Sequence, residues 1–353
     1  MKAARWYEKG DIRVEDIPVP EPGPGEVRVK VKACGICGSD LHEFNAGPFI
    51  IPRRAHPLTG RELGPVTLGH EFSGDVDAIG EGVSGWEKGE KVTVNPLIYC
   101  GECAGCKSGQ HLLCSKLATA GFAADGAFAE YIVVPAYGLV KLADHIDYDM
   151  GAFVEPLAVA VRAVRRSGLQ MGQTVAIIGG GPIGLLVALV CKALGASKIF
   201  ISEPMKSRLE LAEKLGVTAA IDPTQDDPGK VIAGYTNKAR ADVAIDCVGI
   251  QPSFDAAIKV TGRRATICVA GLALKPIEVP FLKLWGHEKT VTFTQGYEDE
   301  DFAAAAALLE NGAVDIKPLI TGRIGLDKLV DDGLKALKEQ ADKQVKILVY
   351  PEK

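Results

Sequence analysis

A glycine-rich loop between two apolar segments constrains the fold of this chain more than any other feature. The stretch from Thr174 to Cys191 has no charged residue over 18 positions, a length that could also suit a membrane span. Four glycines and Pro182 interrupt the stretch after a five-residue apolar start. This pattern predicts a buried strand, a tight turn and a buried helix that ends at Gly195.

The same alternation of apolar strands and helices continues along the second half of the chain. From about Gln173, apolar runs alternate with helical stretches, and these runs read TVAIIG, KIFIS, AAID, ADVAIDCVG and RRATICVAG. Such alternation predicts an α/β domain with a parallel sheet covered on both faces. Residues 1 to about 155 instead contain short strands with one face in water, such as Val27 to Lys32. Towards the end we expect helices over 302–311 and 326–340, then a strand over 345–350.

The glycine loop itself predicts a dinucleotide site. Gly179 to Gly184 satisfies G-x-G-x-x-G between a strand and a helix, and Glu203 follows 19 residues later at the end of the next strand. An acid there accepts hydrogen bonds from ribose hydroxyls and repels a 2′-phosphate, which favours NAD over NADP, although Lys206 and Arg208 lie close. The alternative is a glycine-rich turn that binds nothing. The expected cofactor-binding residues are Gly179, Gly181, Pro182, Ile183, Gly184, Glu203 and Arg208.

Four closely spaced cysteines predict a closed metal site. Cys100, Cys103, Cys106 and Cys114 are separated by two, two and seven residues, so they can fill a tetrahedral zinc shell without water. An iron–sulfur cluster fits the spacing less well, and the chain's odd total of nine cysteines argues against paired disulfides. No secretory signal stands at the N-terminus, so we expect reduced thiols and a cytoplasmic protein.

A second set of metal donors comes from distant parts of the sequence. Cys37, His70, Glu71 and Glu155 offer a thiolate, an imidazole and carboxylates, the mixed donors typical of a catalytic zinc with one open position. Spacing alone supports this set weakly, because a single Cys, His or Glu is more often structural. A lone Cys37 in particular would usually be a buried thiol.

Five motifs together resemble the zinc-dependent medium-chain dehydrogenases. They are GICGSDLH (35–42), GHEFSG (69–74), the four-cysteine lobe, VEPLAVA (154–160) and GGGPIG (179–184), in the family's order over essentially the whole chain. The Glu-Pro pair in VEPLAVA, the inserted stretch 52–74 and the ending VKILVYP look like the polyol and 2,3-butanediol dehydrogenase branch.

The resemblance implies a fold and a set of roles. It implies a GroES-like catalytic domain made of residues 1–155 with 296–353, a Rossmann domain over 156–295, and a homodimer or homotetramer. Cys37 and His70 become ligands of one zinc ion, Glu155 falls at the third ligand position, and Glu71 is a fourth ligand or an adjacent carboxylate. Ser39 and His42 match the family's proton relay. With the cysteine lobe, this gives two zinc ions per chain.

The expected activity is hydride transfer between NAD and a short secondary alcohol or vicinal diol. The preferred reaction interconverts (R,R)-2,3-butanediol and acetoin; alternatives are sorbitol, threonine or a simple secondary alcohol, and a non-catalytic NAD-binding protein. Sorbitol-type enzymes carry an arginine where this chain has Gly296, which favours a short diol. The formal net charge of −5 and the lack of a basic run argue against nucleic acid or an anionic membrane as partner.

Overall fold

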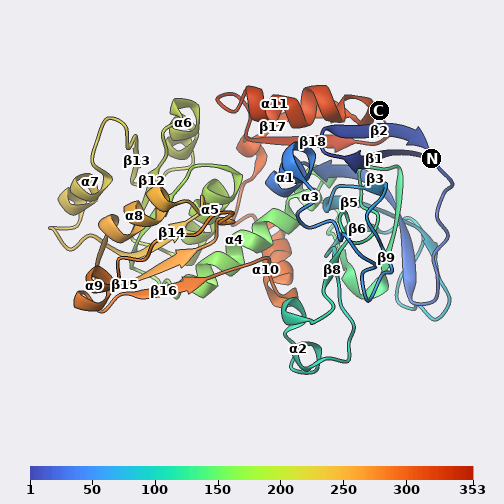
Figure 1. Ribbon diagram of the computed structural model, residues 1–353, viewed down its shortest axis with the longest axis horizontal. Coiled ribbons are helices and arrows are strands. Elements are labelled where there is room, and N and C mark those ends of the chain that lie inside the picture. The colour runs from blue at the N-terminus through green and yellow to red at the C-terminus, as the bar shows by residue number, and fades with distance from the viewer. Residues whose placement is uncertain (353) are drawn as a thin grey trace. The chain divides into compact units, whose positions relative to one another are not determined.

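The chain folds into two compact units, and the computed structural model describes residues 1–352 (Figure 1). The first unit contains Met1–Glu155, Glu298–Asn311 and the segment from Ile320 onward, and the second contains Pro156–Tyr297 and Gly312–Leu319. Sequence analysis assigned all of 296–353 to the first unit. Residues 296–297 and 312–319 belong instead to the second, to which the chain returns with the buried apolar side chains of Val314, Ile316 and Leu319.

Strands dominate the first unit. They are β1 (Lys2–Glu8), β2 (Asp11–Asp16), β3 (Glu26–Gly35), β4 (Val66–Thr67), β5 (Glu71–Ile79), β6 (Lys91–Val94), β7 (Leu97–Ile98), β8 (Ala118–Thr119), β9 (Tyr131–Pro135), β10 (Leu139–Lys141), β17 (Ile320–Gly325) and β18 (Lys346–Tyr350). The largest sheet has the order β10-β6-β5-β3-β18-β17, and β9 also pairs with β3. Along β3, Val27, Val29 and Val31 alternate into the core with polar neighbours, as predicted for this stretch.

Helices in the first unit are short, apart from one. They are α1 (Gly38–Ala46), α2 (Ala104–Lys107), α3 (Tyr148–Ala152), α10 (Asp299–Glu310) and α11 (Ala336–Glu339). The single helix predicted over 326–340 is replaced by a 3₁₀ turn (Leu326–Lys328), a π-helical segment (Leu329–Lys335) and α11. Gly333 sits in the π segment with no room for a side chain, because a Cβ there would lie 2.8 Å from the Ile36 side chain.

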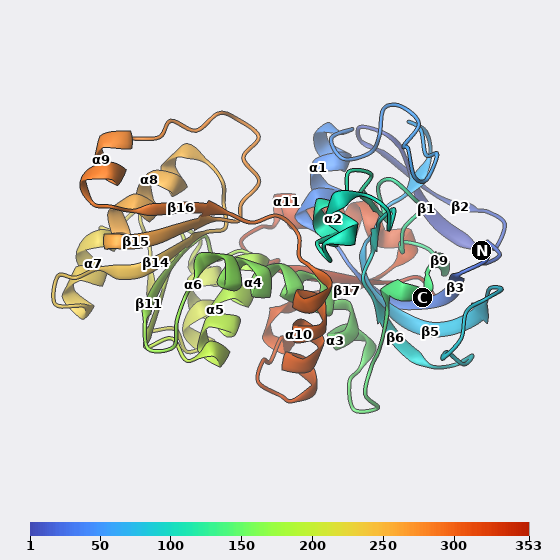
Figure 2. The same ribbon diagram turned by 90° about the horizontal axis from the view of Figure 1, so that it is seen from below.

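The second unit is a parallel sheet with helices on both faces. Its strands are β11 (Thr174–Ile178), β12 (Lys198–Ser202), β13 (Ala219–Ile221), β14 (Ala241–Asp246), β15 (Thr261–Val269) and β16 (Thr290–Phe293), in the order β13-β12-β11-β14-β15-β16. Its helices are α4 (Val154–Ser167, which begins in the first unit), α5 (Pro182–Leu194), α6 (Lys206–Lys214), α7 (Pro228–Tyr235), α8 (Gln251–Val260) and α9 (Phe281–Gly286). Figure 2 shows α5 and α8 on opposite faces of the sheet. The predicted α/β fold with a doubly wound parallel sheet is confirmed.

The uncharged stretch 174–191 forms β11, the glycine loop and most of α5, as predicted. All five side chains of β11 are buried, because it is a central strand of a parallel sheet whose two faces are covered by helices. In the described part of the chain, no helix has the length and apolarity needed to cross a bilayer. The order of strands changes direction beside β11, so the loop lies at the sheet position where dinucleotides bind in such folds.

Candidate functional site

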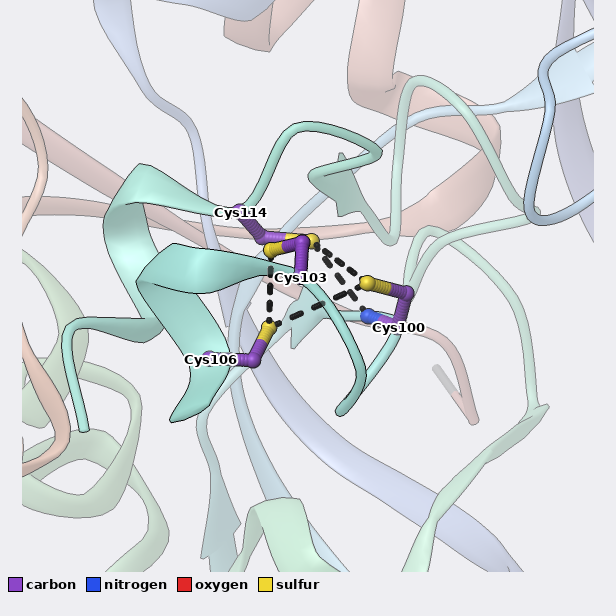
Figure 3. Close-up of side chains that lie close together, drawn as sticks. All are labelled: Cys100, Cys103, Cys106 and Cys114. Carbon is purple, nitrogen blue, oxygen red and sulfur yellow. Dashed lines mark hydrogen bonds between the residues drawn. The ribbon is translucent and has the colours of Figure 1, made fainter. Parts of the chain in front are cut away.

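The four cysteines of the lobe converge on one point (Figure 3). Their sulfur atoms all lie within 4.8 Å of one another, with 3.5 Å between those of Cys100 and Cys114 and 3.6 Å between those of Cys103 and Cys106. All four thiols are free, so no disulfide competes for them. The arrangement fits a metal ion whose whole shell is protein sulfur.

Backbone donors around the lobe favour the thiolate form that a metal needs. The N–H groups of Cys106 and Ser115 lower the pKa of Cys103 to about 5. Burial acts in the opposite direction on its neighbour and raises the pKa of Cys106 to about 12. Four sulfur atoms so close together cannot all be deprotonated without a cation among them, and a divalent metal bound there would supply the positive charge that the donor set lacks.

The lobe is anchored by contacts that sequence analysis did not predict. His111 Nδ1 lies 2.5 Å from Asp299 Oδ2, and its ring stacks on Tyr99 with 3.8 Å between the ring centroids. The backbone N–H of Leu112 donates to Glu298 Oε2 at 3.1 Å. Asp299 and Glu298 stand at the N-terminus of α10, where carboxylates are favoured by the helix dipole. His111 therefore has a structural role, which no sequence pattern around it indicated.

Three of the predicted catalytic donors come together in the first unit. Donor atoms of Cys37, His70 and Glu71 lie within 4.8 Å of one another. Cys37 immediately precedes α1 and follows the end of β3, whereas His70 and Glu71 lie at the start of β5. Because β3 pairs with β5, with Gly35 opposite Glu71, the three donors come together. Among the described residues, Glu155 does not belong to this group, and it lies in the first turn of α4.

A buried carboxylate orients the histidine of this group. Asp40 is fully buried; its Oδ2 accepts the N–H of Cys37 at 2.9 Å, and its Oδ1 lies 3.6 Å from His70 Nδ1. The other ring nitrogen, Nε2, lies 3.4 Å from Ser39 Oγ. Burial opposes protonation of His70, but the charges of Asp40 and Cys37 outweigh it and raise the pKa of His70 well above its usual value. The pocket thus attracts positive charge, which fits a metal cation.

The two predicted relay residues lie on one helix. Ser39 is half-buried beside His70, and His42 is exposed one turn further along α1. Residues three apart on a helix lie on the same face, so the two side chains lead from the donor group towards solvent.

Glu71 has a partner that sequence analysis missed. Its Oε2 forms an ion pair with Lys346 Nζ, and both side chains are almost fully buried. From the sequence alone, a lysine at the start of an apolar strand is expected to be an exposed strand end. Only the sheet order, with β3 between β5 and β18, shows that the two charges meet.

The glycine loop has the properties of a phosphate cradle. A Cβ at Gly181 would meet only Arg208 Nη1, at 3.9 Å, so this glycine leaves space at the N-terminus of α5 that no protein atom fills. Glu203 Oε2 accepts the N–H of Gly180 at 2.7 Å and lies 3.9 Å from Arg208 Nη1. The loop geometry and the free N–H groups of a helix start fit the pyrophosphate of a dinucleotide.

Pro182 and Ile183 occupy the first two positions of α5, which agrees with their predicted place after the loop. Proline is suited to the first position because an N–H group there would have no partner within the helix, so its absence costs no hydrogen bond. Gly184 permits the close approach of α5 to β11, since a Cβ there would overlap the carbonyl oxygen of Gly179.

Comparison with known families matches both units. Residues 23–144 match the alcohol dehydrogenase GroES-like domain, and residues 182–311 match the zinc-binding dehydrogenase family.

Full-length relatives extend the match to specific enzymes. An (R,R)-butanediol dehydrogenase of Bacillus subtilis (strain 168) is 40% identical over 99% of this chain and 100% of its own. A sorbitol dehydrogenase of the same organism is 33% identical over 99% of this chain and 97% of its own. The crystal structure of 2R,3R-butanediol dehydrogenase from Bacillus subtilis has a TM-score of 0.92 and covers 99% of each chain at 40% identity. A zinc-binding dehydrogenase from Sinorhizobium meliloti bound to NADP has a TM-score of 0.87 over 99% of each chain at 34% identity.

Proposed function

The chain belongs to the zinc-dependent medium-chain alcohol dehydrogenases, and on that premise we propose that it interconverts (R,R)-2,3-butanediol and acetoin with NAD. It is an oxidoreductase that uses zinc and a nicotinamide cofactor. The choice of diol is supported by the higher identity to the butanediol enzyme than to the sorbitol enzyme. Gly296, in place of the arginine typical of sorbitol-type enzymes, points in the same direction.

The observation that carries the proposal is the group of half-buried Cys37 and buried His70 and Glu71. Unlike the four-sulfur lobe, it offers fewer protein donors than a full shell and lies beside a hydroxyl and a solvent-exposed imidazole. Held there by these side chains, zinc would polarise an alcohol or carbonyl oxygen and would lower the pKa of the alcohol. We assign Cys37 and His70 as ligands, with Glu155 or Glu71 as the third, and the cysteine lobe as a second, structural zinc site.

Residues of α1 provide the path for the substrate proton. Ser39 Oγ, 3.4 Å from His70 Nε2, is placed to accept the proton of a hydroxyl held at the donor group. His42, exposed on the next turn, exchanges that proton with solvent, since an imidazole can both accept and donate a proton. Asp40 lies on the Nδ1 side of His70, and Nε2 faces Ser39, so the negative charge of Asp40 favours this orientation of the ring.

The preference for NAD rests on Glu203. Its carboxylate is buried at the end of β12 and holds the loop through Gly180 N and, at 2.9 Å, Met205 N. A fixed negative charge at that point disfavours a 2′-phosphate. Arg208, on the other side of Glu203, offsets part of that charge, so substitution of Glu203 by Gln is expected to improve the use of NADP relative to NAD.

We also propose that two copies of the chain pair through β16. Among residues 1–352, this strand ends the parallel sheet and pairs only with β15. On β16, on α9 just before it and just after β15 in the chain are apolar side chains that are each more than 60% exposed: Leu272, Phe281, Leu282, Trp285 and Phe293. An open strand edge flanked by apolar side chains is suited to antiparallel pairing with its own copy across a two-fold axis.

Initial rates on a stereo-defined panel test the substrate. The panel contains (R,R)-, (S,S)- and meso-2,3-butanediol, sorbitol, L-threonine and 2-propanol, each with NAD⁺ and with NADP⁺. We expect the highest kcat/KM for the (R,R) diol with NAD⁺. Faster turnover of sorbitol would assign the chain to the polyol dehydrogenases instead, and the 33% identity to a sorbitol dehydrogenase makes this the second candidate.

A variant of the ligand set tests whether the open site does the chemistry. Cys37→Ser is expected to abolish turnover and to reduce bound zinc from two ions per chain to one, because only the lobe still holds metal. Cys34→Ser, which changes a buried thiol outside the donor group, is the matched control and should retain both ions. Unchanged turnover in Cys37→Ser would exclude the assigned site and leave a non-catalytic NAD-binding protein as the alternative.

A further inference from the structure

A buried lysine lies directly behind the open donor group. Lys346 is 2% exposed, and its ammonium contacts Glu71 Oε2 and donates to the backbone carbonyl of Ile36 at 3.0 Å. Glu71 is 1% exposed.

The sheet is built to let this pair form. Glu71 opens β5 and Lys346 opens β18, and the end of β3 lies between them, with Gly35 opposite Glu71 on one side and Leu348 on the other. A Cβ at Gly35 would overlap Glu71 Oε2 and lie 3.0 Å from Lys346 Cε. The glycine therefore leaves the space through which the two side chains reach each other across the middle strand.

Stability does not explain this arrangement. Removing two charges from water costs several kcal/mol per ion, and apolar replacements of a buried pair are often as stable or more stable. The pair also contacts the donor group and not an ordinary core, because Glu71 is itself one of its three members. We therefore look for the function of the Glu71–Lys346 pair at the metal site.

We propose that Lys346 is a positioning residue that keeps Glu71 out of permanent coordination and so leaves a zinc position for the substrate oxygen. This inference rests on the proposed function, since it concerns the same zinc site. A carboxylate that already neutralises an ammonium is a weaker donor to a second cation. With Glu71 retained by Lys346, the third protein ligand is Glu155, and Glu71 contributes its charge from beside the site.

Cobalt(II) replacement of zinc provides a readout that needs neither substrate nor NAD. The visible spectrum of Co²⁺ reports its ligands, and the all-sulfur lobe contributes the same background in every variant. In wild type, added imidazole should bind the open position and change the spectrum. In Lys346→Met, Glu71 is released to the metal, so the spectrum should change before imidazole is added and the imidazole affinity should fall at least tenfold. The double variant Glu71→Gln/Lys346→Met should regain the wild-type affinity.

A second pair of variants covers the case in which Lys346→Met fails to fold. Gly35→Ala pushes the two side chains apart without changing any charge, and it should shift the Co²⁺ spectrum in the same direction as Lys346→Met. Gly38→Ala is the matched control, because no atom lies within 4 Å of a Cβ there. Wild-type spectra and imidazole affinity in both Lys346→Met and Gly35→Ala would overturn the proposal, and so would wild-type behaviour in Gly35→Ala alone if Lys346→Met does not fold.

The two proposals fail in different ways. If no diol is oxidised but the Co²⁺ spectra follow the expected pattern, the substrate assignment is wrong and Lys346 still positions Glu71. If (R,R)-butanediol is oxidised while the variant spectra match wild type, the activity stands and the role given to Lys346 is wrong.

Discussion

Gly181 and Gly184 of the nucleotide loop should respond differently to substitution by alanine. At Gly184 we expect mainly a loss of stability, and at Gly181 mainly a loss of NADH affinity. At Gly184 a methyl group would overlap the carbonyl oxygen of Gly179 and lie 3.0 Å from its carbonyl carbon, so α5 must move away from β11. Overpacking against backbone costs about 1–3 kcal/mol. For a protein of this size, each kcal/mol lowers Tm by about 2–4 °C. Gly184→Ala should therefore lower Tm by roughly 2–12 °C with no nucleotide present.

Gly181→Ala is the matched variant. Its Cβ would meet only Arg208 Nη1 at 3.9 Å, and its φ of −70° suits any residue. The loss of a good N-cap residue costs about 0.5–1 kcal/mol, so Tm should change by only a few degrees. NADH affinity should nevertheless fall at least tenfold, because the methyl group occupies the space left for the pyrophosphate.

Thermal unfolding followed by circular dichroism, together with NADH titration by fluorescence, separates the two effects. Similar losses of Tm in both variants would mean that Gly181 has a packing role like that of Gly184. Unchanged NADH affinity in Gly181→Ala would refute the claim that the open space at this glycine accommodates the cofactor.

Three further changes test other parts of the molecule. Cys114→Ser should release the lobe metal to a chelator and lower Tm, while the open site keeps its zinc, as metal analysis of the protein will show. Burial, aided by Arg240, lowers the pKa of Lys289 to about 8 in the folded chain, so the unfolded chain binds more protons from about pH 8 to 10.5. The free energy of unfolding should therefore rise across that window, and Lys289→Met should flatten this part of the rise in urea titrations. Trp285→Glu should shift the chain towards monomer in light scattering, whereas Met171→Glu, at another exposed apolar residue of the same unit, should not.

The cysteine lobe could be predicted from the sequence because its chemistry is local. All four sulfur donors lie between Cys100 and Cys114, so the spacing alone constrains the geometry. The glycine loop could be predicted equally well, because the strand and the helix on either side of it are its immediate neighbours in sequence. Helix α7 was not predicted, although Asp227 followed by Pro228 is a readable start signal and Asp227 caps the helix in the structure.

The open donor group was a different problem, because its members come from separate strands and helices. Spacing gave only a weak indication for Cys37 and His70, and the resemblance to a known family supplied their pairing. That resemblance left Glu71 and Glu155 as alternatives. The structure places Glu71 with the other two donors, but it also gives Glu71 a lysine partner that the sequence did not reveal. Whether a lysine in an apolar strand is buried depends on which strands flank it, and that is a property of the sheet order.

The space beside a glycine can serve a contact within the protein or a bound molecule, and the surroundings of a Cβ built there help to tell the two apart. Gly35 and Gly181 both lack a side chain beside a proposed functional group, but a Cβ would meet different surroundings at each. At Gly35 the space is already taken by Glu71 and Lys346, so the glycine serves a contact within the protein. At Gly181 the space is open although the position could accept alanine without a clash, so packing within the chain gives no reason for glycine. The space at the start of α5 is therefore free for a molecule that approaches the backbone, and the pyrophosphate of a nicotinamide dinucleotide has the charge and shape for that place.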